Sequence, residues 1–460
     1  MRAWRLTSLS GIVTLAAMAA SAVHAESPGT LQAAIGNPSD LKIAATVRVR
    51  YEAEDGQPRA GFDFSSDVVA IKSTLTAEYH HGALRIGGEL DDSRIYGGSR
   101  DGSVSANDVN TFEPVQGYVG LDFADAFGRG SRLSLQAGRM TMNLGSRRLV
   151  SSDEYRNAVQ SYTGLRADLK GRDGTALTVF YMLPQAHRPD DLAAVLDNRA
   201  ALDKESLDLQ LFGALLSRPK TVFGSMLELG YYRLLERDAP GRLTKDRDLH
   251  TLTARVLREP KAGQLDFEFE GAWQMGRISA GSAANAARLN VNAGLIHAAM
   301  GYTLPGAAKL HTSAFYDWVS GDQPGGSYNR FDTLFGMRRG EWAPSGVFAA
   351  IGRANISAAG IRLEAAPGKR FDGMVAYRAM WLASRHDAFS TTGVVDKTGR
   401  SGRFAGHLLD ARMRYWLVPG LLRGELNLDW IAKGRFMGNA PNAPASGNTH
   451  YVGAALTASL

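Results

Sequence analysis

Five arginines lie in and just after the segment LQAGRMTMNLGSRRLV, residues 135–150: Arg139, Arg147, Arg148, Arg156 and Arg166. The guanidinium group is planar, stays protonated, and binds a carboxylate through two parallel hydrogen bonds. A channel that lines its narrowest part with such groups selects anions. We interpret these five side chains as one side of an anion-binding constriction.

The sequence contains no motif of a known catalytic centre. G-x-S-x-G, H-E-x-x-H and the phosphate-binding P-loop are all absent from it. The only close pair of histidines, His80 and His81, falls in a predicted short turn, which we interpret as a solvated turn and not as a metal site. The sequence therefore predicts neither an enzyme nor a bound metal or cofactor.

The segments that carry the arginines alternate apolar and polar residues, which is typical of a β-strand with one dry face. The pattern is clear at residues 42–52, 264–276 and 421–430. About 18 such segments follow one another. They begin near residues 42, 68, 83, 113, 131, 162, 175, 206, 222, 249, 264, 288, 308, 347, 371, 405, 421 and 449.

Short and long connections alternate between these segments. Tight turns such as HHG and VPG are each followed by a long polar stretch after the next strand. A transmembrane barrel has this arrangement, with short periplasmic turns and long extracellular loops. The sequence thus predicts an all-β fold: an antiparallel up-and-down barrel of about 18 strands over residues 41–460, with its polar faces turned to a wet lumen.

The first 25 residues have the parts of a secretory signal peptide: Arg2 and Arg5, an apolar run, and small Ala25 at the cleavage position. We predict cleavage after Ala25 and a short periplasmic segment over residues 26–40. The chain has no cysteine, so extensive pairing or packing has to stabilise the exported protein without disulfides. We expect no nucleic-acid partner. We expect the protein to contact outer-membrane lipid.

Two further groups of arginines join the predicted constriction. They lie on the first and last strands: Arg48, Arg50 and Arg85, and Arg412, Arg414 and Arg423. The two groups become neighbours when the last strand pairs with the first. The alternative is that the arginines only brace the wall in pairs with acids, namely Glu52, Glu89, Asp91, Asp92, Asp153 and Glu425.

Arg139 falls where the alternation requires an apolar residue. We predict that the strand leaves its lipid-facing register there through a bulge, and that Arg147 and Arg148 begin a loop turned toward the lumen. The long loop from Val319 to Gly346 is expected to be an ordered element that narrows the mouth, because its apolar residues would otherwise be exposed.

The first arginine segment resembles the alginate export family of outer-membrane porins. Nine residues match the motifs of this family: Gly138, Arg139, Gly145, Arg148, Leu149, Arg156, Asn157, Gly164 and Arg166. Met140, Ser146 and Tyr162 depart from them. A second stretch in the long loop is also similar to the family, through Ser320, Gly321, Asp322, Phe331, Asp332, Leu334 and Phe335.

This resemblance implies an 18-strand barrel in the bacterial outer membrane that passes an anionic polysaccharide or another anionic solute. Two hypotheses within this class stay open, an exporter of an anionic polysaccharide and an uptake porin for small organic anions. An outer-membrane enzyme would need a polar triad at one rim, and none was found. A soluble secreted binding protein would need charged residues on both strand faces, which the alternation contradicts.

Overall fold

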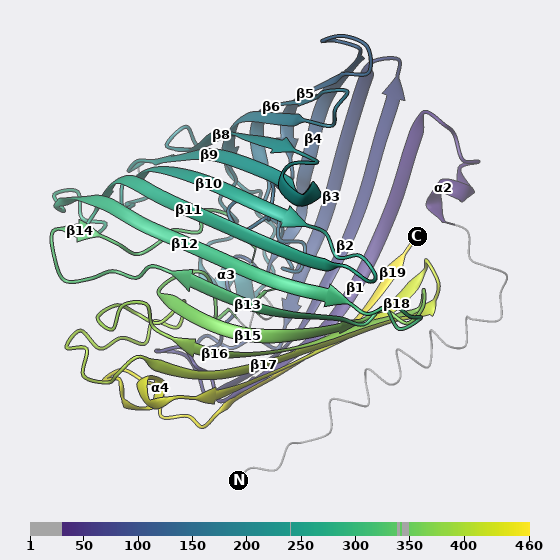
Figure 1. Cartoon of the computed structure of the whole chain (residues 1–460). Coiled ribbons are helices and arrows are strands. Elements are labelled where there is room, and N and C mark those ends of the chain that lie inside the picture. Colours follow the sequence, from purple (N-terminus) through teal and green to yellow (C-terminus); the bar gives the residue numbers. More distant parts are fainter. Residues whose placement is uncertain (1–29, 240, 338–340, 343–348) are drawn as a thin grey trace.

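Strands in which apolar and polar residues alternate form most of the chain, and together they close into a barrel (Figure 1). The computed structural model describes residues 30–239, 241–337, 341–342 and 349–460. The predicted signal peptide, residues 1–25, lies outside the described residues. Of the nineteen strands in this sheet, β14 has two residues and the other eighteen form the wall. The predicted fold class and strand number are therefore confirmed.

Each wall strand pairs antiparallel with the next, and β1 pairs with both β2 and β19, which closes the barrel. The strands are β1 (Leu41–Asp55), β2 (Ser65–His81), β3 (Leu84–Tyr96), β4 (Asn110–Ala124), β5 (Arg132–Met140), β6 (Tyr162–Lys170), β7 (Ala176–Pro184), β8 (Leu209–Arg218), β9 (Met226–Glu236), β10 (Asp248–Arg258), β11 (Leu265–Ser279), β12 (Arg288–Thr303), β13 (His311–Val319), β14 (Ser327–Tyr328), β15 (Ile356–Ala365), β16 (Phe371–Trp381), β17 (Phe404–Val418), β18 (Leu422–Lys433) and β19 (Thr449–Ser459). The wall is therefore a closed sheet of hydrogen-bonded neighbours, the form in which β-strands can cross hydrocarbon.

The helices of the described residues are short and are not part of the wall. They are α2 (Leu31–Ala34), α3 (Leu192–Leu196) and α4 (Arg435–Asn439), with one 3-10 turn at Val222–Gly224. Within the described ranges, no helix has the length and apolar character needed to cross a membrane.

The strand β11 shows how the alternating sequence orients the wall. Its apolar residues Phe269 and Trp273 are 45% and 51% exposed on the outside. Its polar residues Asp266, Glu270 and Gln274 are buried inside. Because successive side chains of a strand point to opposite faces, one register decides both faces. The apolar face therefore meets lipid and the polar face meets the lumen.

Two details of the expected strands differ from the structure. The strand expected near residue 347 is β15, which begins at Ile356, and residue 347 itself lies outside the described residues. The bulge predicted at Arg139 is wrong, because β5 stays in register with β4 and β6 through this residue. The irregularity lies one strand earlier, where the pairing of β3 with β4 shifts between Glu89 and Leu90.

The lumen is not empty, because long loops fold into it and pack there. An apolar cluster inside the barrel combines wall residues such as Tyr162 and Phe180 with loop residues such as Leu149, Val150 and Phe331. The polar lumen predicted from the strands thus contains an apolar core of its own, which holds the loops in place.

Candidate functional site: a constriction across the lumen

The loop between β5 and β6, residues 141–161, is attached to the wall at β1. Arg48 of β1 donates hydrogen bonds to the backbone carbonyls of Glu154 and Arg156, at 3.1 and 3.0 Å. Arg50 donates to the carbonyl of Tyr155 at 2.6 Å, and its guanidinium lies 4.3 Å from the centre of the Tyr155 ring. Two arginines predicted to line the pore therefore hold this loop by its backbone.

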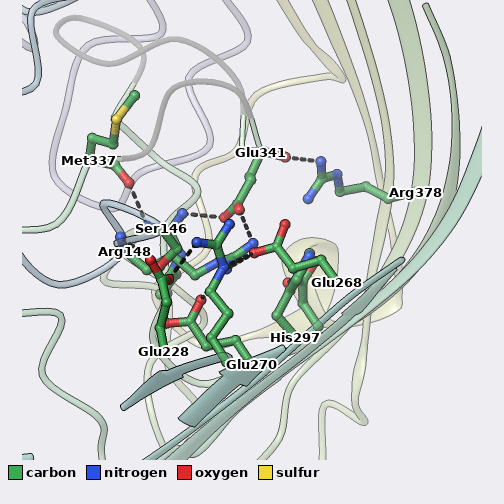
Figure 2. Close-up of polar contacts among 12 residues, drawn as sticks. Ser146, Arg148, Glu228, Glu268, Glu270, His297, Met337, Glu341 and Arg378 are labelled. Atoms are coloured by element: carbon green, nitrogen blue, oxygen red, sulfur yellow. Dashed lines mark hydrogen bonds and ion pairs between the residues drawn. The ribbon is translucent and has the colours of Figure 1, made fainter. Parts of the chain in front are cut away.

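The same loop is attached to the opposite part of the wall through Arg148. Figure 2 shows its guanidinium among the carboxylates of Glu268 and Glu270 from β11 and of Glu341 from the loop after β13. Ser146 supports the contact by donating a hydrogen bond to Glu270 at 3.0 Å. Because β1 and β11 lie far apart around the barrel, the loop crosses the lumen and narrows it.

Arg148 is 2% exposed, so its charge depends on these partners. Burial by itself lowers the pKa of Arg148, but Glu341, Glu270 and Glu268 outweigh it and hold the pKa well above its ordinary value. Burial likewise raises the pKa of Glu341, and Arg148 and Arg353 hold it well below the ordinary value. Both groups are therefore charged over the whole physiological pH range.

Three arginines beyond the predicted set extend this cluster. Arg255 of β10 pairs with Glu228 and Glu268, Arg353 pairs with Glu341, and Arg378 of β16 donates to the carbonyl of Glu341. Beside the cluster lies a cavity of about 190 Å³, lined in part by Arg148, Arg378 and His297. Sequence reasoning missed these arginines because each of them occurs singly in an ordinary alternating strand or loop.

The described part of the loop between β13 and β15 packs against the first loop. Val150 and Phe335 form a parallel β-bridge, in which the Phe335 amide donates to the Leu149 carbonyl at 2.9 Å. Phe331 is 2% exposed, and Asp332 pairs with Arg247, the residue before β10, at 2.7 Å. Both segments that resemble the alginate export family therefore meet inside the barrel.

The remaining residues of the second motif shape the start of this loop. The Ser320 hydroxyl accepts a hydrogen bond from the Gly294 amide, and the Asp322 carboxylate accepts one from the Asn329 amide, each at 2.9 Å. Gly321 lies against Asn355, so close that a Cβ atom would come within 2.1 Å of the Asn355 side-chain oxygen. The motif thus builds a tight turn into the lumen.

A buried asparagine anchors each loop. Asn157 is fully buried, and its side-chain amide lies within hydrogen-bond distance of the carbonyls of Ile71, Arg94 and Asp108. In the second loop, the side-chain amide of Asn355 lies within hydrogen-bond distance of three backbone carbonyls of residues 384–388. Each amide satisfies carbonyls that would otherwise be buried without a partner. Asn157 matched the family motif, whereas nothing in the sequence singled out Asn355.

A row of cations crosses the wall below the first loop. Arg48 lies directly opposite Lys72 of β2 on one side and Thr457 of β19 on the other, and Arg423 of β18 lies opposite Thr457. Directly opposite residues share one face of a sheet, so Lys72, Arg48 and Arg423 form what we call the basic row. The predicted constriction consisted of arginines alone and therefore did not include Lys72.

The basic row borders a cavity of about 390 Å³, whose acidic lining residues are Glu89 and Glu154. Lys72 pairs with Asp91 at 2.6 Å. In the described part of the chain, Arg48 and Arg423 form no ion pair with an acid. The guanidinium of Arg423 lies instead 5.5 Å from the centre of the Trp416 ring.

Four other predicted arginines on the wall are each paired with an acid nearby. Arg85 pairs with Glu78 and Asp122, Arg166 with Asp168, and both Arg412 and Arg414 with Asp372. In the first loop, Arg156 pairs with Asp153 at 3.0 Å, and the half-exposed Arg147 lies 3.9 Å from Glu154. The structure does not bring these wall residues into the Arg148 cluster. Among the acids named in the bracing alternative, Asp153 pairs with Arg156 and Glu52 pairs with Arg50, whereas the four wall arginines pair with other acids.

Arg139 lies apart from the other predicted residues. It is directly opposite Gly117 and Thr163, on the face that β4 and β6 turn to the membrane. Its side chain pairs with Glu113 and with Glu205 of the loop before β8. It joins the wall to this loop and does not meet Arg148.

The described residues hold no group of three or more histidine or acidic side chains arranged for a metal ion. The imidazole of His80 lies 2.7 Å from Glu78.

Comparison with known proteins places the chain among outer-membrane barrels. The alginate export family matches residues 39–450. No curated protein matches the chain. Among solved structures it is similar to Pseudomonas aeruginosa OccK2 (OpdF), with a TM-score of 0.56, 14% identity, and 92% of this chain and 98% of that chain covered.

The chain is also similar to the Pseudomonas aeruginosa outer membrane protein OpdK, with a TM-score of 0.55 and 12% identity over 91% of this chain and 99% of that one. OccK2 has in addition been solved in complex with glucuronate, and this structure matches with a TM-score of 0.55 and 14% identity over 92% and 98% of the two chains. At sequence identities this low, the structural similarity establishes the fold alone. With the family match and the closed barrel, it identifies the chain as an outer-membrane channel that belongs to the alginate export family.

Proposed function

We propose that this channel passes a small anionic solute, of the size of a sugar acid, and that it does so without catalysis. The observation that carries the proposal is the basic row. Most other arginines of the lumen are neutralised by acids, but Arg48 and Arg423 have no ion-paired acid in the described part of the chain. An arginine without a carboxylate partner keeps its net positive charge, which attracts an anion.

The hydrogen bonds of Arg48 favour the same solute. Its guanidinium is bound by two carbonyl oxygens, which orient the group without cancelling its charge. Arg423 is held over an indole ring, which attracts a cation and also leaves the net charge in place. The cavity beside these groups therefore offers a positive wall to a solute that leaves the constriction.

The size of the solute follows from the loop that crosses the lumen. The cavities beside the Arg148 cluster and beside the basic row hold about 190 and 390 Å³. These volumes suit a single sugar acid better than a polymer, which favours the small organic anion over the polysaccharide of the two hypotheses. OccK2, a protein of the same fold, has been solved in complex with glucuronate, and glucuronate is an example of such a solute.

The test is the reversal potential of the channel in planar bilayers across a potassium chloride gradient. We expect anion selectivity in the native protein, a loss or reversal of it in Arg423→Glu, and its retention in the charge-conserving control Arg423→Lys. Glucuronate added on one side should reduce the chloride current more than glucose does. A native channel that prefers cations would refute the proposal.

A further inference from the structure

The outside of the barrel carries a hollow that the channel function does not explain. It holds about 250 Å³ and lies on β15 to β18, where its lining is apolar. Its rim consists of side chains that are 41 to 48% exposed: Leu363, Val375, Met413 and Leu428. These residues alternate with the lumen-facing residues of their strands, so the hollow opens toward the membrane.

Small residues on neighbouring strands cause the hollow. Gly373 of β16 lies directly opposite Ala365 of β15 and Met413 of β17. Ala411 of β17 lies directly opposite Val375 of β16, next to Gly373 on the same face. A glycine and two alanines thus meet where other parts of this wall carry large apolar side chains, and the surface is recessed by the missing volume.

The hollow lies in the half of the membrane near the periplasm. Ala365 and Phe371 border the short turn between β15 and β16, and short turns mark the periplasmic side. Phe371 lies directly opposite Tyr415, which is 46% exposed, so an aromatic pair marks the level where the hydrocarbon meets the headgroups. Depth and polarity both fit one acyl chain.

Two cations lie at the periplasmic end of the hollow. Lys369 and Arg370 are exposed in the turn that leads directly into Phe371. The Arg370 carbonyl accepts a hydrogen bond from the Trp416 amide at 2.8 Å, which holds this turn beside β17. Exposed lysine and arginine at the level of the headgroups attract lipid phosphate.

We infer that this hollow is a binding site for one phospholipid of the periplasmic leaflet. An acyl chain fills the recess over Ala411, beside the Phe371 ring that lies against Gly373, and the phosphate contacts Lys369 and Arg370. Ordinary lipid around a barrel exchanges freely, whereas this lipid is held at both ends. The positive charges of Lys369 and Arg370 next to the apolar recess distinguish this hollow from a purely apolar surface that any hydrocarbon could cover.

The inference is tested by native mass spectrometry of the full mature chain, stripped of lipid in detergent and titrated with dioleoyl phosphatidylglycerol. The native protein should retain one lipid per chain. Gly373→Leu and Ala411→Leu, which fill the recess, should weaken retention about tenfold each, as expected for the loss of roughly two buried methylenes. The recess is filled by two separate substitutions, so a folding defect in one variant does not prevent the test with the other.

The double variant Lys369→Glu, Arg370→Glu should abolish the preference for phosphatidylglycerol over a diacylglycerol with the same acyl chains. Matched controls are Ala379→Leu, on the same strand and face outside the hollow, and Lys309→Glu, in another short turn, and both should bind as the native protein does. Equal retention by the native protein and by both filled variants, or no retention at all, overturns the inference. An oligomer that Gly373→Leu dissociates also overturns it, and assigns the hollow to a second copy of this chain.

Discussion

Val150 and Phe335 pair as two residues of a parallel β-bridge in the middle of the barrel, although they belong to loops on different parts of the wall. The Ser151 amide donates to the Phe335 carbonyl at 3.0 Å, and the Phe335 amide donates to the Leu149 carbonyl at 2.9 Å. Arg148 and Glu341 pair close to this bridge. The two loops therefore form one unit, and we expect them to respond together to changes at the constriction.

Replacing Arg148 by alanine should detach the first loop from β11. Three glutamates would then lose one of their cations, while Arg255 and Arg353 stay beside the cluster. Breaking a buried ion pair costs at most about 3–5 kcal/mol. We expect a lower thermal midpoint and a larger single-channel conductance. The control is Arg147→Ala, because this neighbour is half-exposed and lies 3.9 Å from its acid. Equal conductance of both variants would contradict the role of Arg148.

Asn157→Asp should loosen the other attachment of the same loop. The substitution keeps the shape but replaces the amide donor by an oxygen that faces the carbonyls of Ile71, Arg94 and Asp108. The expected cost is about 1–3 kcal/mol, measured as the free energy of unfolding in urea. Asn107→Asp is the control, since the Asn107 amide donates only at 3.4 Å to Ser105. A stable Asn157→Asp protein would show that the three carbonyls do not need this donor.

Stability should depend on pH through Asp108, in the loop before β4. Burial, together with the nearby Glu52, raises the pKa of Asp108 to about 6, from an ordinary value of 3.8. Because the folded pKa is the higher one, the folded state binds the proton more tightly, and this contribution to stability declines as the pH rises from about 4 to above 6.

Asp108→Asn should therefore stabilise the protein at pH 7, by at most about 3 kcal/mol, and the advantage should vanish near pH 4. The thermal midpoints of the two proteins across this range measure the effect. Asp101→Asn, an exposed position in the same loop, serves as the control and should show no such trend. A constant difference between native protein and Asp108→Asn at every pH would contradict the assignment.

Gly138→Ala should impair the end of β5. Gly138 has a φ of +123°, and a Cβ atom there would lie 2.4 Å from the carbonyl oxygen of Gly117. We expect a destabilisation of about 1–3 kcal/mol, read from the heat-modifiable mobility of the folded barrel. Gly117→Ala, on the other side of the same contact, has open space around its Cβ position and should fold normally. Identical behaviour of the two variants would refute this explanation.

Much of the architecture was predictable because its signals are local. The alternation at residues 42–52 and 264–276 places the apolar face outward whatever the rest of the chain does, since one register decides both faces. The glycine at position 138 and the arginine that follows it matched a family motif. The predicted bulge at Arg139 was wrong because a bulge is not a local feature. Whether it forms depends on how β5 pairs with β4 and β6, which the order of residues in β5 does not decide.

The roles of the arginines depended on tertiary contacts. By itself the sequence determined an outer-membrane barrel with cations on its inner face. Only the closed barrel and its inward loops decided that Arg148 is neutralised by Glu268, Glu270 and Glu341. They also decided that Arg48 and Arg423 form no ion pair with an acid among the described residues. Charge compensation acts over a few ångströms, and the groups that lie this close come from segments far apart along the chain.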